Sequence, residues 1–542
     1  MTNKGKYRSS IIEKLFQKSE FINRPENHLK NLVESHGRFS KFSHLGANIY
    51  YDYSRQRIDE EVMDLLFNLA EEKKLKHKFK DMIEGRNVNI TENRAALHTA
   101  LRDFSNKPVL VEGKNVASDI NNVRNNIKDF AEKIREGSIT GSTNKPFKYV
   151  VVVGIGGSHL GTEFVSTSLN MFADKTIQIF YLSNVDIHLF GEIASSIDPE
   201  TTLWIVISKS YTTPETKANE KLVREYLKLN NLDPPRHIVT VTSKGSPGDN
   251  PGISNLKTFH MFDFVGGRFS VSSAVGGVPL SIYLGYGMFE RFLKGANEMD
   301  QHAQNETVGK NLPMIAALLS FWNISILKYP ALAIIPYASS LAKLAPHIQQ
   351  LCMESNGKCV TRNGETLSDP AGYIIFGEPG TNAQHSFFQL AHQGPPFPID
   401  FIGVVKPYYN EFQLKTNGVT NHQELWANLI AQPEALAEGK QNNDPAKGFE
   451  GNRPSSTLLI EELSPENIGS LLAFYEAKTV FEAFLWNINP FDQFGVELGK
   501  SIASAYRNEI TVKNKNPDYA FESLDETSKF YLETLFSGKL KR

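Results

Sequence analysis

A single carboxylate, Glu354, has neighbours that suit acid–base chemistry. It lies in the segment Gln349–Lys358, QQLCMESNGK, directly after the apolar Met353 and four residues before a lysine. Apolar neighbours disfavour the charged form of a carboxylate and a nearby cation favours it, and a general base needs this balance. The same segment also fits a helix that ends in a left-handed cap at Asn356 and Gly357. Taken alone, the segment leaves both interpretations open.

The loop Gly154–Ser158, GIGGS, has the composition of an anion site. It follows the apolar run YVVVV and precedes a helix-like segment. Glycines at this point let a ligand approach the backbone N–H groups of a helix N-terminus. A dinucleotide fingerprint would need a third glycine where His159 stands and an acidic residue about twenty residues later, whereas Asp186 lies about thirty residues beyond the loop. The loop therefore predicts an anion site and argues against a nicotinamide site.

A second loop, Ser208–Thr216 (SKSYTTPET), follows the apolar run TLWIVI. Its hydroxyl groups and Lys209 are the donors that a phosphate monoester needs. Thr213 is expected to cap the next helix, with Pro214 in the first turn. An ordinary helix entry rich in serine and threonine has the same composition. Two such loops at the carboxyl ends of adjacent parallel strands would lie together, and this pairing favours a phosphate site.

Further residues carry groups that could assist such chemistry. Arg268 follows two glycines, and its permanently charged guanidinium would stabilise an enediolate oxygen; a surface ion pair is the alternative. His385, near the start of a predicted helix, would shuttle a proton. His392 follows seven residues later, whereas metal-binding pairs on helices lie three or four residues apart, so no metal is predicted. Lys500 lies in GVELGKS, which lacks the glycine spacing of a P-loop, so no nucleotide is expected.

Composition excludes several classes of function. The 542 residues include 58 basic and 60 acidic side chains, and a formal net charge of −2 gives no field for nucleic acid or an anionic membrane. The two cysteines, Cys352 and Cys359, do not match zinc spacings, and so few thiols suggest a reducing compartment. The longest apolar stretch, Met314–Leu327, is shorter than a membrane span, and the N-terminal residues lack the pattern of a secretory signal.

The elements that must position these residues follow from hydrophobic periodicity. Helices are expected over the first hundred residues, including TENRAALHTALRDF with Thr91 as its N-cap, and Pro433–Ser456 is expected to be a surface loop. Two sets of apolar strands alternate with helical segments, which predicts parallel, doubly wound sheets. The first set is Tyr149–Gly154, QIFYL, Thr202–Ile207 and HIVTVTS; the second is Ala331–Tyr337, Tyr373–Gly377, Ile399–Val405 and Thr457–Leu463.

Seven segments together resemble the glucose-6-phosphate isomerase (phosphoglucose isomerase) family. They are TENRAALHTALR, GIGGSHLG, SKSYTTPET, GGRFSVSSAVG, QQLCMESNGK, GTNAQHSFFQLAHQG and FDQFGVELGK, and their order and approximate spacing also fit. The resemblance implies an α/β fold with two doubly wound, sugar-isomerase-type (SIS) domains and parallel sheets. The smaller, phosphate-binding domain would span 117–283, and the larger one, with the N-terminal helices, 1–116 and 284–505. Residues 506–542 would form a C-terminal arm.

The resemblance also implies residue roles. Glu354 would move a proton between C1 and C2 of the substrate through a cis-enediol, which Arg268 would stabilise. His385, supplied in the family by the neighbouring chain, and Lys500 would assist ring opening, with Glu215 in the same region. The residues implied to bind the phosphorylated sugar are Gly157, Ser158, Ser208, Lys209, Ser210, Thr213, Gln350 and Gln493. Four positions depart from the commonest family pattern without removing a required group, namely His159, Ser210, Tyr211 and Cys352.

The function that the resemblance implies is the reversible isomerisation of glucose 6-phosphate and fructose 6-phosphate in glycolysis and gluconeogenesis. It further implies a cytoplasmic homodimer whose active site is shared across the interface, with no cofactor, no metal, and no nucleic-acid or membrane partner. Two alternatives stay open. One is a bifunctional enzyme that also accepts mannose 6-phosphate, because the motifs do not fix the direction of a sugar hydroxyl. The other is a non-catalytic regulator that binds phosphosugars through the Ser/Thr loops.

Overall fold

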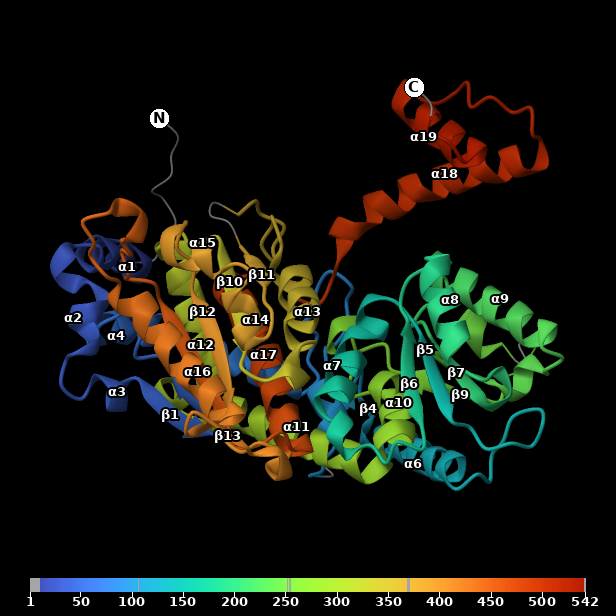
Figure 1. The fold of residues 1–542 in the computed structure, drawn as a ribbon, viewed down its shortest axis with the longest axis horizontal. Helices are drawn as coiled ribbons and strands as arrows, with labels where there is room; N and C mark the ends of the chain where they lie inside the picture. Colours follow the sequence, from blue (N-terminus) through green and yellow to red (C-terminus); the bar gives the residue numbers. More distant parts are fainter. Residues whose placement is uncertain (1–9, 106, 251, 253–254, 368–370, 541–542) are drawn as a thin grey trace. The chain divides into compact units, whose positions relative to one another are not determined.

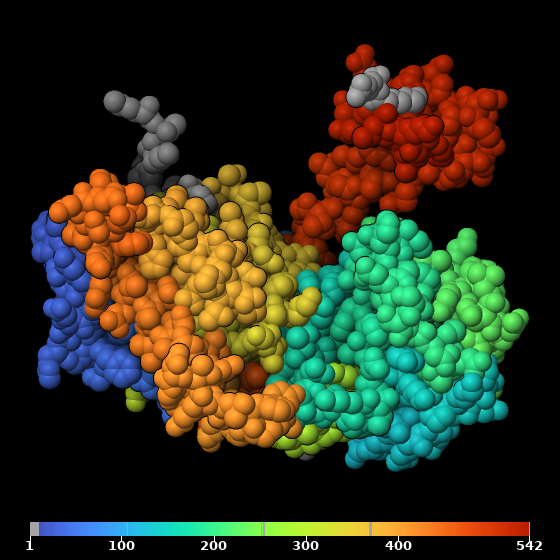
Figure 2. Space-filling view, viewed as in Figure 1, coloured from blue at the N-terminus to red at the C-terminus, as the bar shows by residue number. Residues whose placement is uncertain are grey.

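The computed structural model describes residues 10–105, 107–250, 252, 255–367 and 371–540. By its internal contacts the chain separates into two compact units, Met1–Phe491 and Asp492–Arg542. The first unit has two lobes, one around a five-stranded sheet and one around a six-stranded sheet. Figure 2 shows them side by side, the five-stranded lobe in cyan and green and the six-stranded lobe in blue, yellow and orange.

The five-stranded sheet is parallel throughout and has the order β6-β5-β7-β8-β9. Its strands are β5 (Tyr149–Val153), β6 (Gln178–Leu182), β7 (Thr202–Ile207), β8 (Ile238–Ser243) and β9 (Lys257–Met261). Helices cover both faces, α6 (Ala117–Arg135) and α10 (Ala274–Leu284) on one side, α8 (Ile187–Ser196) and α9 (Pro214–Leu229) on the other (Figure 1). The predicted strands of this region are confirmed. The edge strand β9 was not predicted, because its half-exposed sequence KTFHM lacks a continuous apolar run.

The six-stranded sheet has the order β1-β2-β15-β12-β10-β11. Four strands are parallel, as predicted: β10 (Ala331–Pro336), β11 (Ile374–Phe376), β12 (Ile399–Val404) and β15 (Ser455–Ile460). An antiparallel hairpin, β1 (Ser43–Gly46) and β2 (Ile49–Asp52), extends the sheet beyond β15. The prediction of helices in this region is wrong, because the turn residues Ala47 and Asn48, both with positive φ, are not a strong hairpin signal.

Helix α17 (Pro465–Trp486) lies at the centre of the six-stranded lobe and is buried along its whole length. It packs against α11 (Tyr286–Asn305) and α12 (Leu312–Phe321). Glycine is required where α11 and α17 cross, because a Cβ atom on Gly469 would lie 2.0 Å from the carbonyl oxygen of Phe292. Helix α17 also contacts the segment that carries Glu354, so it forms a support behind that residue.

Shorter elements complete the first unit. The N-terminal helices are α1 (Ser10–Ile22), α2 (Leu29–Val33), α3 (Arg38–Lys41), α4 (Glu60–Glu72) and α5 (Leu75–Ile83). Later helices are α7 (Leu160–Ser168), α13 (Leu344–Ile348), α14 (Gly380–Gln384), α15 (Phe388–Gln393) and α16 (Asn421–Glu438). Two small hairpins pair β3 (Leu110–Val111) with β4 (Lys114–Asn115) and β13 (Lys415–Thr416) with β14 (Val419–Thr420). The lobes meet where α7 packs against α13.

Two local predictions are wrong. The segment TENRAALHTALRDF is not an α-helix; it has one short 3₁₀ turn, Thr99–Arg102, and Asn489 donates hydrogen bonds to Asn89 and Thr91 instead. The segment Pro433–Ser456 is not wholly a loop either. Helix α16 continues through the buried Pro433 to Glu438, and β15 begins at Ser455. In both cases contacts with distant parts of the chain override the local composition.

The second unit contains α18 (Glu497–Lys515) and α19 (Glu526–Ser537). The Lys513 ammonium donates to the carbonyls of Pro517 and Tyr519, each at 2.6 Å, and Phe521 is buried. These contacts fold the chain back after α18. In the described parts of both units, no helix combines the length and apolarity that a bilayer crossing requires. The predicted boundaries at residues 117, 284 and 506 stay predictions.

Candidate active site

Glu354 ends a π-helix, η12 (Gln349–Glu354), which follows α13 directly. Such wide turns are rare and occur frequently at functional sites. The predicted left-handed cap is wrong, because neither Asn356 nor Gly357 has a positive φ. Instead the Lys358 ammonium donates to the carbonyls of Glu354 (2.7 Å) and Ser355 (2.9 Å), which satisfies the end of the helix.

The carboxylate of Glu354 contacts two polar side chains. Its Oε2 accepts a hydrogen bond from Gln350 Nε2 at 3.1 Å and lies 3.4 Å from a terminal nitrogen of Arg268. The Glu354 side chain is 23% exposed and the Arg268 side chain 1%. The cation beside the carboxylate is therefore Arg268, while Lys358 bonds the backbone. A ligand can reach the carboxylate, and the guanidinium is enclosed by protein.

Arg268 is held in one orientation by groups on both sides. It lies in a 3₁₀ turn, η8 (Gly267–Phe269), and its Nε donates to Ser355 Oγ at 2.7 Å. A terminal nitrogen donates to the carbonyl of Pro490. The residue is only 2% exposed, so the alternative of a surface ion pair is wrong. A planar guanidinium with fixed donors keeps its positive charge next to the Glu354 carboxylate.

The first predicted anion loop packs against the Arg268 turn, backbone to backbone. A Cβ atom on Gly157 would lie 2.3 Å from the carbonyl carbon of Gly267, so only glycine allows this approach. Ser270 Oγ donates to the Gly157 carbonyl at 3.2 Å. A Cβ atom on Gly156, which has φ +57°, would lie 3.0 Å from Gln350 Nε2. The loop that carries Ser158 is therefore fixed beside Arg268 and the amide that bonds Glu354.

The second predicted anion loop follows β7, the strand next to β5, so both loops leave the same edge of the sheet. Helix α9 begins at Pro214 as predicted, but the Thr213 side chain makes no capping bond. Its hydroxyl instead accepts from Ser208 Oγ at 3.5 Å. Ser210 Oγ and Thr212 Oγ1 are 2.7 Å apart. The hydroxyl groups thus gather at an uncapped helix N-terminus, where an anion is favoured.

Lys209 has a different environment from the one expected for a phosphate ligand. Its ammonium donates to the carbonyls of Asp263 (2.8 Å) and Val265 (2.9 Å), in the segment that leads to Arg268. Burial lowers the pKa of Lys209 to about 8, and Arg94 acts in the same direction. In this structure Lys209 ties the second loop to the Arg268 segment, and its contact with a phosphate stays a prediction.

Two further predicted residues, Glu215 and His385, make no contact with Glu354 among the described residues of the first unit. Glu215 is half-buried in the first turn of α9, and His385 is exposed at the end of α14 in the six-stranded lobe. Gln493 and Lys500 belong to the second unit, where Lys500 donates to Glu497 at 3.1 Å. The roles of these four residues stay predictions.

Several contributors to the site were missed by sequence reasoning. Ser355 lies directly after the base, and its hydroxyl orients Arg268, yet its position in the motif was the only signal. The Pro490 carbonyl on Arg268 is a backbone contact without any side-chain signal. Buried residues behind the π-helix, Glu482 above all, were missed because they lie far away in the sequence.

Together, fold and site define a class: α/β proteins that bind an anionic ligand at the carboxyl ends of parallel strands and hold a carboxylate–guanidinium pair beside it. A family model described as phosphoglucose isomerase matches residues 52–524. A "Glucose-6-phosphate isomerase" of Desulfosudis oleivorans is 60% identical over 515 residues, 94% of each chain. A "Glucose-6-phosphate isomerase, cytosolic" of Arabidopsis thaliana is 44% identical over 530 residues, 94% of each.

A solved structure agrees with these matches. The crystal structure of a glucose-6-phosphate isomerase from Chlamydia trachomatis superposes with a TM-score of 0.88 at 35% identity, and the match covers 98% of this chain and 99% of that one. The chain belongs to the phosphoglucose isomerase family.

Proposed function

We propose that this chain interconverts glucose 6-phosphate and fructose 6-phosphate, with Glu354 as the base that moves the proton between C2 and C1. Membership of the family supports the reaction. The observation that carries the residue assignment is the contact of Glu354 with Arg268 and Gln350, beside two loops suited to a phosphate. In this arrangement the substrate can reach the Glu354 carboxylate, and the buried Arg268 guanidinium holds a positive charge beside it.

The proposed chemistry needs only side-chain groups. Glu354 removes the proton from C2 of the open-chain aldose, and the electron pair moves toward C1 to form a cis-enediol(ate). Arg268 stabilises the negative charge that develops beside the carboxylate, an effect worth about a hundredfold or more in rate. Return of the proton to C1, with transfer of the O2 hydroxyl proton to O1, gives the ketose. Gln350 holds one carboxylate oxygen, so the base meets the substrate in one orientation.

The phosphate is proposed to bind at the loops after β5 and β7. The backbone N–H of Gly157 and the hydroxyls of Ser158, Ser208, Ser210 and Thr213 would supply the donors. Five neutral donors around a dianion suit reversible binding, since hydrogen bonds to charged groups each contribute about 1.5–3 kcal/mol. Gln493 would contact the sugar, and Lys500 and Glu215 would assist ring opening.

Glu354→Gln tests the assignment. The amide keeps the size of the side chain but cannot accept the C2 proton, so kcat should fall by about 10²–10⁴-fold. Substrate affinity, measured by calorimetry, should change less than about threefold, because the loops after β5 and β7 are untouched. Glu365→Gln, at an exposed position in the same lobe, is the matched control and should behave like the parent chain. Near-normal turnover of Glu354→Gln would contradict the proposal.

We further propose a cytoplasmic homodimer in which each active site receives the partner's His385. The exposure of His385, without a contact to Glu354 in the described chain, supports this arrangement. A hybrid of Glu354→Gln and His385→Ala chains would then hold one intact site, so mixed and reassociated inactive variants should regain about a quarter of the parent activity. If a mixture that has formed hybrids stays inactive, the shared site is wrong.

A role in glycolysis and gluconeogenesis follows from the proposed substrates. The alternative of a non-catalytic binder is disfavoured, because the Glu354–Arg268 contact would have no purpose in holding a phosphate. Activity toward mannose 6-phosphate depends on the shape of the sugar pocket, and a substrate panel at fixed enzyme concentration measures it.

A further inference from the structure

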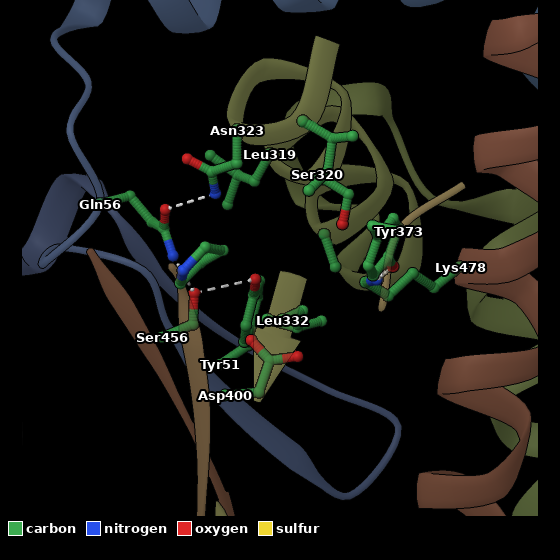
Figure 3. Close-up of a pocket in the computed structure, with 13 residues that line it drawn as sticks. Tyr51, Gln56, Leu319, Ser320, Asn323, Leu332, Tyr373, Asp400, Ser456 and Lys478 are labelled. Carbon is green, nitrogen blue, oxygen red and sulfur yellow. Dashed lines mark hydrogen bonds between the residues drawn. The ribbon is translucent and has the colours of Figure 1, made fainter. Parts of the chain in front are cut away.

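A buried polar network lies behind the π-helix that carries Glu354. Its centre is Glu482 of α17, whose side chain has no exposed surface. One carboxylate oxygen, Oε1, accepts from Lys478 Nζ at 2.6 Å and from the Tyr373 hydroxyl at 2.7 Å. Lys478 also donates to the Tyr373 hydroxyl at 2.7 Å, and Figure 3 shows the two side chains meeting beside a small cavity. These three groups form a closed triangle of hydrogen bonds.

The other oxygen of Glu482 reaches the base segment. Its Oε2 accepts from Asn356 Nδ2 at 2.8 Å and from Cys352 Sγ at 3.6 Å. Cys352 and Asn356 lie two residues before and two residues after Glu354, and both are buried. One carboxylate oxygen on α17 therefore holds both flanks of the residue proposed as the base.

The charges in this network are matched. Burial acts to lower the pKa of Lys478, but the Glu482 carboxylate, with Asp400 in the same direction, outweighs it, so the pKa is raised and the cation is kept. Burial raises the pKa of the Cys352 thiol to about 12, so it stays protonated and donates. A buried ion pair is tolerated only where further hydrogen bonds satisfy it, and four donors around Glu482 meet that condition.

We propose that Glu482 is a positioning residue for Glu354, which it holds in place through Asn356 and Cys352. The inference rests on the proposed role of Glu354 as the base. Other anchors of the segment do not reach α17: Gln349 Nε2 donates to the Ile375 carbonyl at 2.9 Å, and Arg268 bonds Ser355. Lys358 bonds the carbonyls of Glu354 and Ser355. Among the described residues, Glu482 bonds both flanking residues, whereas the Thr479 carbonyl of α17 accepts from Asn356 alone, at 3.3 Å. Displacement of a catalytic group by about 1 Å can cost about a hundredfold in rate.

The test is Glu482→Gln. The amide has one acceptor where the carboxylate has two, so Asn356 or Lys478 loses its partner and the base segment shifts. We expect kcat to fall about tenfold to a hundredfold, while KM changes less than threefold because no substrate-binding loop is touched. A variant that only loosened the fold would lose melting temperature without this separation of kcat from KM.

Glu476→Gln is the matched control on the same helix. Glu476 is equally buried, and it accepts from Arg102 rather than from the base segment. Arg102 keeps two bonds to Asp300 in this variant, so the fold should survive. Its melting temperature is compared with that of Glu482→Gln. Its kcat should stay within twofold of the parent value. If both variants lose kcat in parallel, Glu482 has only a structural role.

A second variant covers the case in which Glu482→Gln does not fold. Asn356→Ala removes the 2.8 Å bond between Glu482 and the base segment, together with the Asn356–Thr479 bond. It leaves the Lys478–Glu482 pair intact, and it should also lower kcat. Normal kcat in either folded variant overturns the proposal for Glu482. Glu354→Gln is measured alongside: if that variant is active, the proposed base is wrong, whereas an inactive Glu354→Gln with a normal Glu482→Gln refutes the positioning role alone.

Discussion

The loop Ser208–Thr213 and the segment Gln349–Lys358 contribute to the same candidate site by opposite means. The loop presents neutral hydroxyls that bond one another across two to five residues. The segment presents a carboxylate whose neighbours Ser355 and Asn356 bond residues 87 and 126 positions away, Arg268 and Glu482. Hydroxyl groups gathered in one local loop suit the binding of an anion, and a carboxylate in a segment fixed by remote groups suits a proton transfer. Changes in the loop should therefore alter KM, and changes around the segment should alter kcat.

Among the tests of this division between KM effects in the loop and kcat effects around the segment, Arg268→Lys should give the largest change. Lysine keeps the charge but cannot donate to Ser355, Pro490 and Glu354 together, as the planar guanidinium does. Steady-state kinetics should show kcat reduced by about 10²–10³-fold with KM little changed. Arg291→Lys makes the same change at an exposed pair with Glu466 and should leave both constants near the parent values. A mainly KM effect of Arg268→Lys would break the division.

A second test asks whether a charged carboxylate lowers the free energy of unfolding in the buried surroundings of Lys478 but not on the surface. Burial raises the pKa of Asp400, beside Lys478 and Tyr475, to about 6 from 3.8. Below about pH 4 the carboxyl is protonated in both the folded and the unfolded chain, so it costs nothing. Between about pH 4 and pH 6 the folded chain keeps the proton of this carboxyl, whereas the unfolded chain has lost it. The resulting loss of stability reaches about 3 kcal/mol above pH 6.

Asp400→Asn removes that cost and keeps an acceptor for the Tyr475 hydroxyl, which lies 3.3 Å from Asp400. Thermal melting should show a higher Tm than the parent at pH 7.5 and almost no difference near pH 4. The control is Asp64→Asn on the exposed surface of α4, where solvation changes little on folding. A variant less stable than the parent at pH 7.5 would show that the charged form of Asp400 supports the fold.

The smallest effect is expected in the loop. Thr213→Val removes a hydroxyl that caps nothing, so Tm should not change, while loss of one hydrogen bond to a phosphate should raise KM about tenfold at constant kcat. Thr420→Val is a matched contrast, because Thr420 forms a complete capping box on α16. That variant should lose about 1 kcal/mol of stability with normal KM. If Thr213→Val lowers kcat instead, the loop does more than bind.

The same contrast explains what could be predicted from the sequence. Four parallel strands of each sheet and the start of α9 at Pro214 follow from local apolar runs and a proline, and they are confirmed. The β1–β2 hairpin and the helix through Pro433 depend on packing against distant strands, which local composition does not encode. In the site, the loop hydroxyls were evident from their spacing. The contacts of Arg268 with Ser355 and Pro490, and of Glu482 with Asn356, required the fold.

The most direct test of the central claim follows the transferred proton. The parent chain and Glu354→Gln are incubated with fructose 6-phosphate in deuterated water, and deuterium at C1 and C2 of the recovered sugars is measured by NMR. The parent should incorporate deuterium, because a carboxyl that carries the substrate proton can exchange it with solvent. Glu354→Gln should bind the sugar phosphate with near-parent affinity and incorporate almost none. Incorporation by Glu354→Gln at the parent rate would contradict the assignment of Glu354 as the base.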